Sequence, residues 1–184
     1  KNSQDNIALH RLYAWLLMED RRYDEALGQY RIIDGSAHAN GNELFNFAQR
    51  LHQEHAYKSA SDAFKDIIDN DQHSPLLPSA RFGYARAVEE QVALADTSAA
   101  PSESHPTYNH VIQLYESIAA DHGIPDLAAQ SLYRIGVIKL DKLFDLNGAL
   151  DAFTRMKALP ATSSIFSDAV LKTGEIQTAR NDLA

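Results

Sequence analysis

The segments YDEALGQYRII (residues 23–33) and YKSASDAFKDI (residues 57–67) share one pattern at an interval of 34 residues. Each begins with Tyr, has Ala three residues later, an aromatic residue four further on, and ends with Ile. Steps of three and four residues place these positions on one face of a helix. A helical face that recurs at a fixed interval is typical of an array of stacked structural repeats.

The same four positions recur twice more, so each position forms a column of four residues. The columns are Tyr23, Tyr57, Tyr108 and Leu146; Ala26, Ala60, Val111 and Ala149; Tyr30, Phe64, Tyr115 and Phe153; and Ile33, Ile67, Ile118 and Met156. Upstream of each copy, a large apolar residue precedes a small one. These pairs are Tyr13-Ala14, Phe47-Ala48, Phe82-Gly83 and Ile135-Gly136. A small residue at this position lets two helices approach closely. The large–small pair is assigned to a first helix, A, and the four columns to a second helix, B, so each copy is predicted to be a helix pair.

A 34-residue unit with these columns resembles the tetratricopeptide repeat, and residues 21–33 (RRYDEALGQYRII) are similar to that family's helix-B signature. The resemblance covers roughly residues 5–160. It implies an all-α fold, a right-handed superhelical solenoid of stacked antiparallel helix pairs with about nine helices. The chain departs from the family at the helix-A Trp column, which holds His10, Leu44, Ser79 and Leu132. An irregular helical bundle is the alternative.

The array is expected to form a single domain over residues 1–184. The predicted repeats span residues 7–35, 41–70, 76–121 and 126–158, and a terminal helix spans residues 165–180. The third repeat contains a long polar insertion, DTSAAPSESHPT (residues 96–107). Loops of this length in a compact domain are usually functional or disordered. The alternative is a surface insertion that costs little free energy.

The composition excludes several classes of function. The chain has no Cys, so disulfides and thiolate chemistry are ruled out, and its formal net charge is −8 with scattered Lys and Arg. Nucleic-acid binders usually carry basic clusters, so we expect no nucleic-acid partner. The apolar runs are too short to span a bilayer, which predicts a soluble protein without direct membrane insertion. KNSQDN at residues 1–6 does not resemble a signal peptide, and we expect it to be a cut or processed end, so that any targeting segment would lie outside this sequence. The composition fits a cytosolic protein and a cell-envelope protein equally.

The resemblance also implies a binding surface, because the A helices of that family line the concave wall of the superhelix. Residues beside the small-residue column face this wall. The candidate groove residues are Arg11, Trp15, Phe45, Asn46, Gln49, His52, Arg81, Tyr84 and Tyr133, and the same columns add Met18, Ala80, Ala87, Val137 and Leu140. Exposed aromatic side chains are typical anchors of protein interfaces. The alternative is that these rings pack against neighbouring helices.

Some members of the family grip the C-terminal carboxylates of a partner with a basic clamp. The matching positions here hold Arg11, Trp15, Asn46, Leu77 and Arg81. Arg11, Asn46 and Arg81 suit this chemistry, whereas Trp15 replaces an Asn and Leu77 replaces a Lys. The full clamp is therefore not expected, and a reduced clamp, in which Arg11 and Arg81 meet a single carboxylate, stays open as an alternative.

No catalytic or cofactor motif appears in the chain. A nucleophile elbow, a P-loop and a dinucleotide fingerprint are all missing. His52 and His55 stand three residues apart, but this is not the HExxH spacing and no third metal ligand suggests itself. We therefore expect no enzyme activity, cofactor or metal.

The sequence predicts a scaffold that holds a protein or peptide segment in the groove lined by the A helices. Two alternatives stay open. The chain could be a structural spacer or oligomerisation segment of a larger protein, self-associating through the ends of the solenoid. It could also be a regulatory module of an attached catalytic domain.

Overall fold

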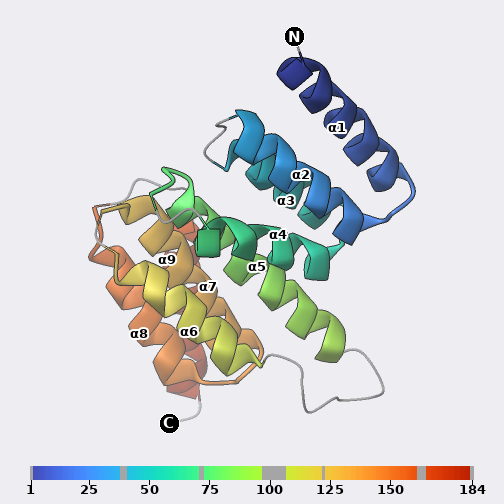
Figure 1. Cartoon of the computed structure of the whole chain (residues 1–184). Helices are drawn as coiled ribbons and strands as arrows, with labels where there is room; N and C mark the ends of the chain where they lie inside the picture. The colour runs from blue at the N-terminus through green and yellow to red at the C-terminus, as the bar shows by residue number, and fades with distance from the viewer. Residues whose placement is uncertain are drawn as a thin grey trace. The chain divides into compact units, whose positions relative to one another are not determined.

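The chain is entirely helical over the residues that the computed structural model describes, which are 2–37, 41–70, 73–96, 107–121, 123–160 and 165–182. Within these ranges there are nine α-helices and no strand (Figure 1). The helices are α1 (Asn2–Glu19), α2 (Tyr23–Ala37), α3 (Asn42–Gln53), α4 (Tyr57–Asn70), α5 (Leu77–Asp96), α6 (Tyr108–Ala119), α7 (Pro125–Asp141), α8 (Leu146–Lys157) and α9 (Ile165–Asp182).

Consecutive helices pack against each other in pairs. Extensive contacts join α1 with α2, α3 with α4, and α7 with α8, as expected for helices A and B of one repeat, and the contact between α4 and α5 is as extensive. Neighbouring repeats are joined by packing of α2 on α3 and of α4 on α5. The predicted fold class, an all-α array of solenoid-like helix pairs, is confirmed.

The chain forms two compact units, Lys1–His105 with α1 to α5 and Pro106–Ala184 with α6 to α9. The boundary falls inside the predicted third repeat, so its A helix (α5) belongs to the first unit and its B helix (α6) to the second. Residues 97–106 of the predicted loop 96–107 lie outside the described residues. The single domain stays a prediction, and each unit is described by itself.

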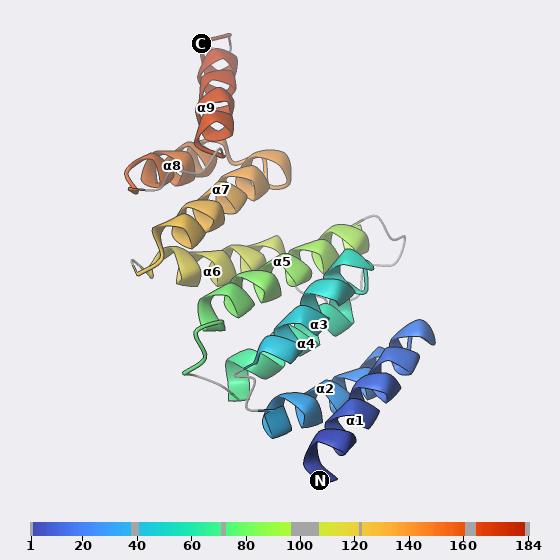
Figure 2. The ribbon, with the colours of Figure 1, turned by 90° about the horizontal axis from the view of Figure 1, so that it is seen from above.

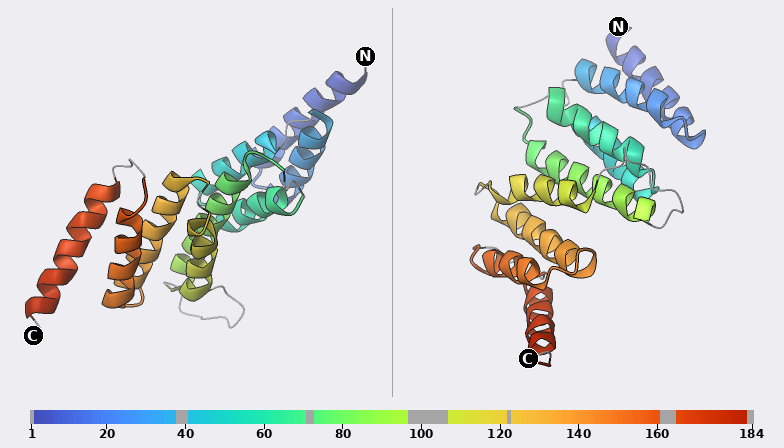
Figure 3. Two further views of the ribbon diagram at one scale, coloured as in Figure 1. Left: turned by 90° about the vertical axis from the view of Figure 1, so that its left-hand side faces the viewer. Right: turned by 90° about the horizontal axis from the view of Figure 1, so that it is seen from below.

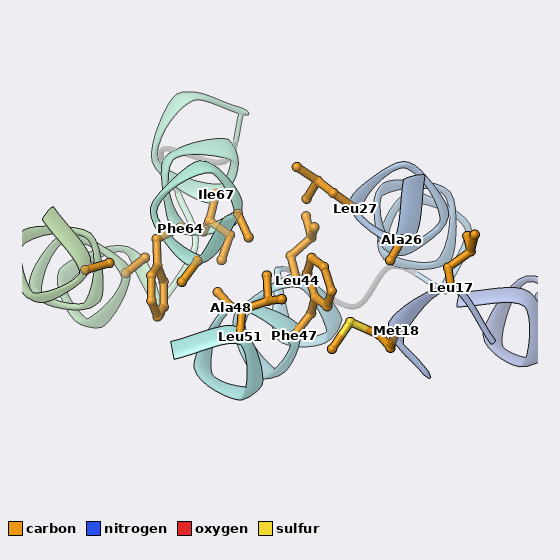
Figure 4. Packing of buried hydrophobic residues seen from close by; sticks show 14 residues of the cluster. Leu17, Met18, Ala26, Leu27, Leu44, Phe47, Ala48, Leu51, Phe64 and Ile67 are labelled. Carbon is orange, nitrogen blue, oxygen red and sulfur yellow. The ribbon is translucent and has the colours of Figure 1, made fainter. Parts of the chain in front are cut away.

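Aromatic rings from the B helices build the core of the first unit. The ring of Tyr30 on α2 stacks on Phe47 of α3, with centroids 4.4 Å apart. Phe64 on α4 lies so close to Gly83 of α5 that a Cβ there would be 2.5 Å from the ring. Figure 2 shows α2 to α5 following one another in this unit, and Figure 4 shows Phe64 beside the apolar residues of α3. Each B-helix ring therefore packs onto the large–small pair of the next A helix.

The second unit repeats part of this packing with a different partner. Figure 3 shows α7 between α6 and α8, in agreement with its contacts to both. Phe153 on α8 lies against Gly136 of α7, the preceding A helix, where a Cβ would again overlap the ring. Phe153, Tyr115, Ile135 and Ile138 are fully buried in this unit. The small-residue column thus admits an aromatic ring in both units.

Side-chain caps begin the two B helices of the second unit. The hydroxyl of Thr107 accepts a hydrogen bond from the backbone N–H of His110 at the start of α6. The carboxylate of Asp145 accepts one from Gly148 N–H at the start of α8, at 2.8 Å. Such caps satisfy N–H groups that have no partner within the helix.

An ion pair links successive B helices in each unit, at matching columns. In the first unit, Arg31 of α2 pairs with Asp66 of α4 at 2.8 Å. Arg31 lies one residue after the aromatic residue of its helix, Tyr30, and Asp66 lies two residues after the aromatic residue of its helix, Phe64. In the second unit Glu116 of α6 pairs with Arg155 of α8 through two hydrogen bonds of 2.8 and 2.7 Å. The two pairs occupy the same columns with their charges reversed.

Candidate binding surface

Eight of the nine candidate residues lie on the A helices of the first unit. We call this set the A-helix surface. It consists of Arg11 and Trp15 on α1, Asn46, Gln49, Phe45 and His52 on α3, and Arg81 and Tyr84 on α5. Tyr133 lies on α7 in the second unit, half-buried and 6.0 Å from the Phe153 ring. It is therefore considered apart from the other eight.

On α1, the surface presents one exposed ring and one cation. Trp15, which is the single Trp of the chain, is 50% exposed. Arg11 is exposed too, but its guanidinium donates a hydrogen bond to the carboxylate of Glu43 on α3. The predicted clamp residue thus already has an acidic partner within the chain, and a carboxylate ligand would have to compete with Glu43 for it.

On α3, the surface is polar at two positions and aromatic at one. Asn46 and Gln49 are exposed. Phe45 is partly buried, packs against the core cluster and lies edge-on to Phe64 of α4, with ring centroids 5.6 Å apart. Tyr133 meets Phe153 at the matching columns of the second unit. Phe45 and Tyr133 therefore each hold the B-helix ring of their own repeat in place.

His52 ends this row on α3 and is partly buried. Its ring lies edge-on to Tyr57 of α4, with centroids 5.1 Å apart, and its Nε2 atom is buried without a protein hydrogen-bond partner. Burial lowers the pKa of His52, and the positive charge of Arg86 on α5 lowers it further. The site therefore favours the neutral imidazole near neutral pH.

His55, the second imidazole of the predicted pair, turns toward the same tyrosine. Its Nδ1 atom lies 2.6 Å from the hydroxyl of Tyr57. The described residues contain no group of three or more His, Asp or Glu side chains arranged to hold a metal ion.

On α5, Arg81 is exposed, whereas Tyr84 is partly buried and packs against the core cluster. Three further positions of the same columns, Met18, Ala80 and Ala87, are buried. Expecting them on the surface was wrong, because these three residues of α1 and α5 pack into the hydrophobic core of the first unit. The accessible part of the A-helix surface is Arg11, Trp15, Asn46, Gln49 and Arg81.

A second exposed surface on α1 was not predicted from the sequence. Leu9, Leu12, Tyr13 and Leu16 are all exposed, and their spacing of three, four and seven residues places them on one face. The signal was present in the sequence, since a helix with apolar residues on this face and on its buried face is apolar nearly all round.

A pocket of about 200 Å³ lies elsewhere, between Arg21, Tyr23 and Ser59 at the turn after α1.

Comparison of the chain with protein-family models and with curated proteins of known function returns no match. Across the described ranges, the helices fall short of the length and apolar character that crossing a membrane requires.

Proposed function

We propose that the chain is a protein-interaction module of tetratricopeptide-like design, which holds a peptide or protein segment on the A-helix surface of its first unit. The single observation that carries this proposal is the exposure of Trp15, which is 50% exposed and lies one helical turn from the exposed Arg11 on α1. Trp is among the residues most enriched at the energetically important positions of protein interfaces, so an exposed Trp is a candidate anchor for a partner.

The neighbouring residues indicate what kind of segment the surface would take. Gln49 and Asn46 can both donate and accept hydrogen bonds, which suits the backbone of an extended peptide. Arg81 adds one exposed cation, while Arg11 is engaged with Glu43. The surface therefore favours a segment with an apolar anchor and at most one carboxylate, which Arg81 would meet, whereas the reduced clamp with both arginines would require Arg11 to leave Glu43.

Photo-crosslinking tests this proposal in the source cell extract. A photoreactive phenylalanine analogue replaces Gln49 in one variant and Lys65, which is exposed on α4, in a matched control. We expect a discrete adduct from the Gln49 position that is missing from the Lys65 position. Mass spectrometry of the adduct names the partner and the segment.

A second arm asks whether the captured segment depends on the surface side chains. The variant combines Trp15→Ala, Gln49→Ala and Arg81→Ala, all at exposed positions, so that circular dichroism and thermal unfolding should match the wild type. Binding of the synthetic segment should weaken at least tenfold, since a buried Trp anchor contributes more than about 1.4 kcal/mol. Equal binding by the folded variant would reject the A-helix surface.

A further inference from the structure

Two ion pairs bridge α1 and α3, and Trp15 lies between them along α1. Arg11 of α1 pairs with Glu43 of α3. Glu19 of α1 pairs with Arg50 of α3 at 3.5 Å, so the second bridge has its charges in the opposite order. Arg11 lies four residues before Trp15 and Glu19 four residues after it, which places all three on one face of α1. Trp15 therefore has a charged neighbour one helical turn away on each side.

The partners on α3 lie on one face as well. Glu43 and Arg50 are seven residues apart, which is two helical turns, and the exposed Asn46 lies between them. Burial raises the pKa of Tyr30 on α2. The charges of Arg50, Glu43 and Arg11 also act on that pKa, so the two bridges share one electrostatic neighbourhood.

Glu43 is held in place by the fold. Its backbone N–H donates a hydrogen bond of 3.2 Å to the carboxylate of Asp34 on α2. It lies in the first turn of α3, where the helix dipole favours a negative charge. Its side chain is 28% exposed, against 54% for that of Arg11. The carboxylate that engages Arg11 is therefore already fixed in the chain, and the carboxylate of a partner would first have to displace it.

Carboxylates outnumber cations in these bridges. Arg50 pairs with Glu54 at 2.8 Å in addition to Glu19. The bridges thus contain two arginines and three carboxylates, which gives them a net negative charge. A further carboxylate placed beside Trp15 would meet like charge, whereas an uncharged or cationic side chain would not.

Arg81 on α5 offers the opposite environment on the same surface. It is exposed, and none of the described residues places a carboxylate within ion-pair distance of its guanidinium. Arg11 and Arg50 are engaged, whereas Arg81 is open to a carboxylate from outside the chain. The A-helix surface is therefore unfavourable to a carboxylate at α1 and favourable to one at α5.

We propose that Glu43 and Glu19 determine the specificity of the A-helix surface by rejecting a carboxylate beside Trp15. The single carboxylate of a bound segment is thereby directed to Arg81. This inference rests on the proposed function, because it concerns the segment held on that surface. The residue of the segment that meets Trp15 is uncharged or basic, and the charge of a Lys or Arg there would be attracted by the face of the indole ring. The segment therefore binds in one direction, with this residue at α1 and its carboxylate at α5.

Quenching of Trp15 fluorescence measures the rejection of anions without any partner. Trp15 is the single Trp of the chain, so the emission of its indole reports one position. The probes are iodide, caesium and neutral acrylamide, at a constant ionic strength of about 0.1 M. In Glu43→Gln the quenching constant of iodide should rise roughly 1.5-fold and that of caesium should fall, while acrylamide should quench as in the wild type.

Two further variants complete this arm. Glu19→Gln should shift the constants in the same direction as Glu43→Gln. The matched control is Glu116→Gln, which removes the same charge from an ion pair of the second unit and should change none of the three constants. Circular dichroism and thermal unfolding confirm that each variant is folded.

The segment that is crosslinked at Gln49 supplies a second arm. Synthetic copies of it carry Asp at each position in turn, and their binding to wild type, Glu43→Gln and Glu116→Gln is measured by fluorescence anisotropy. In the wild type, Asp should be accepted only where the segment lies at Arg81. In Glu43→Gln, copies with Asp beside the residue that meets Trp15 should gain about two- to fivefold in affinity, which is the strength of an exposed ion pair. Glu116→Gln should bind every copy as the wild type does.

Equal iodide quenching in Glu43→Gln and the wild type would overturn the proposal. The same order of affinities among the Asp copies in both proteins would overturn it too, although the proposed function would then stand, since the segment still binds. If no adduct forms at Gln49, the proposed function is rejected instead, and the quenching constants alone decide whether Glu43 excludes anions from Trp15.

Discussion

The ring of Phe64 on α4 occupies the space that a Cβ of Gly83 on α5 would need. An ideal Cβ at residue 83 would lie 2.5 to 2.8 Å from three carbons of the ring. Since Phe64 is buried and also meets Phe45 of α3, the ring has little room to move aside. This contact sets how closely α4 and α5 approach.

Gly83→Ala is therefore expected to destabilise the first unit. Overpacking of a filled core costs about 1–3 kcal/mol, which exceeds the gain of up to about 1 kcal/mol from replacing Gly by Ala in a helix. Chemical denaturation followed by circular dichroism measures the change. Gly28→Ala on α2 is the matched control, because no atom lies within 4 Å of its added Cβ, and it should stabilise. Stabilisation by both substitutions would contradict the packing.

The ion pair between Arg31 and Asp66 should show a measurable but small coupling. Exposed pairs contribute about 0.2–1 kcal/mol, and Arg31 is exposed. Arg31→Asp should destabilise the chain, and Arg31→Asp with Asp66→Arg should recover most of the loss, since the second unit already uses the reversed order at Glu116 and Arg155. A double-mutant cycle from urea unfolding gives the coupling energy. A coupling of zero at low ionic strength would show that the two charges do not interact in solution.

The second unit should lose stability in acid through Glu116. The two hydrogen bonds from Arg155 lower the pKa of Glu116 below its ordinary value of 4.5. The folded state therefore holds this proton more weakly than the unfolded state. The contribution is complete above pH 4.5 and is lost as pH falls through the folded pKa. Urea midpoints measured from pH 6 to pH 3 should fall less steeply for Glu116→Gln than for the wild type. Parallel curves would remove Glu116 from the acid response.

His52 should titrate below pH 6.5, and two charged neighbours, Arg86 and Glu90, should shift its pKa in opposite directions. Burial and Arg86 lower its pKa, whereas Glu90 raises it. Proton NMR of the imidazole should give a midpoint that rises toward 6.5 in Arg86→Gln and falls further in Glu90→Gln. Because the folded pKa is lowered, the contribution of His52 to stability is present above pH 6.5 and is lost as pH falls through the folded pKa. Unchanged midpoints in both variants would show that neither charge reaches the ring.

Much of the fold followed from local patterns. The columns at Tyr30 and Phe64, with the small residues Ala48 and Gly83, identified the helices and their pairing, because a 3.6-residue period is a property of each segment by itself. Gln49 was expected on the exposed face from its place beside the small column, whereas the sequence left Trp15 open between the groove and the core; both are exposed.

Other parts of the candidate site depended on contacts between distant segments. The pairing of Arg11 with Glu43 spans 32 residues, and no periodicity indicated it. The burial of Met18 and Ala87 reflects how closely neighbouring helices approach. The helices α5 and α6 of the third repeat also lie in different units. The sequence did not indicate this division, because their column residues follow the same pattern as those of the other repeats.

The sequence by itself determined that this protein is an array of helix pairs, since helical faces are written in the order of residues along one segment. Only the tertiary structure decided which faces are covered. Tyr13 and Phe47 occupy the same column and resemble each other in size, yet α2 covers Phe47 and none of the described residues covers Tyr13 to the same degree. Burial depends on what lies across the surface, and that is a property of the assembled chain.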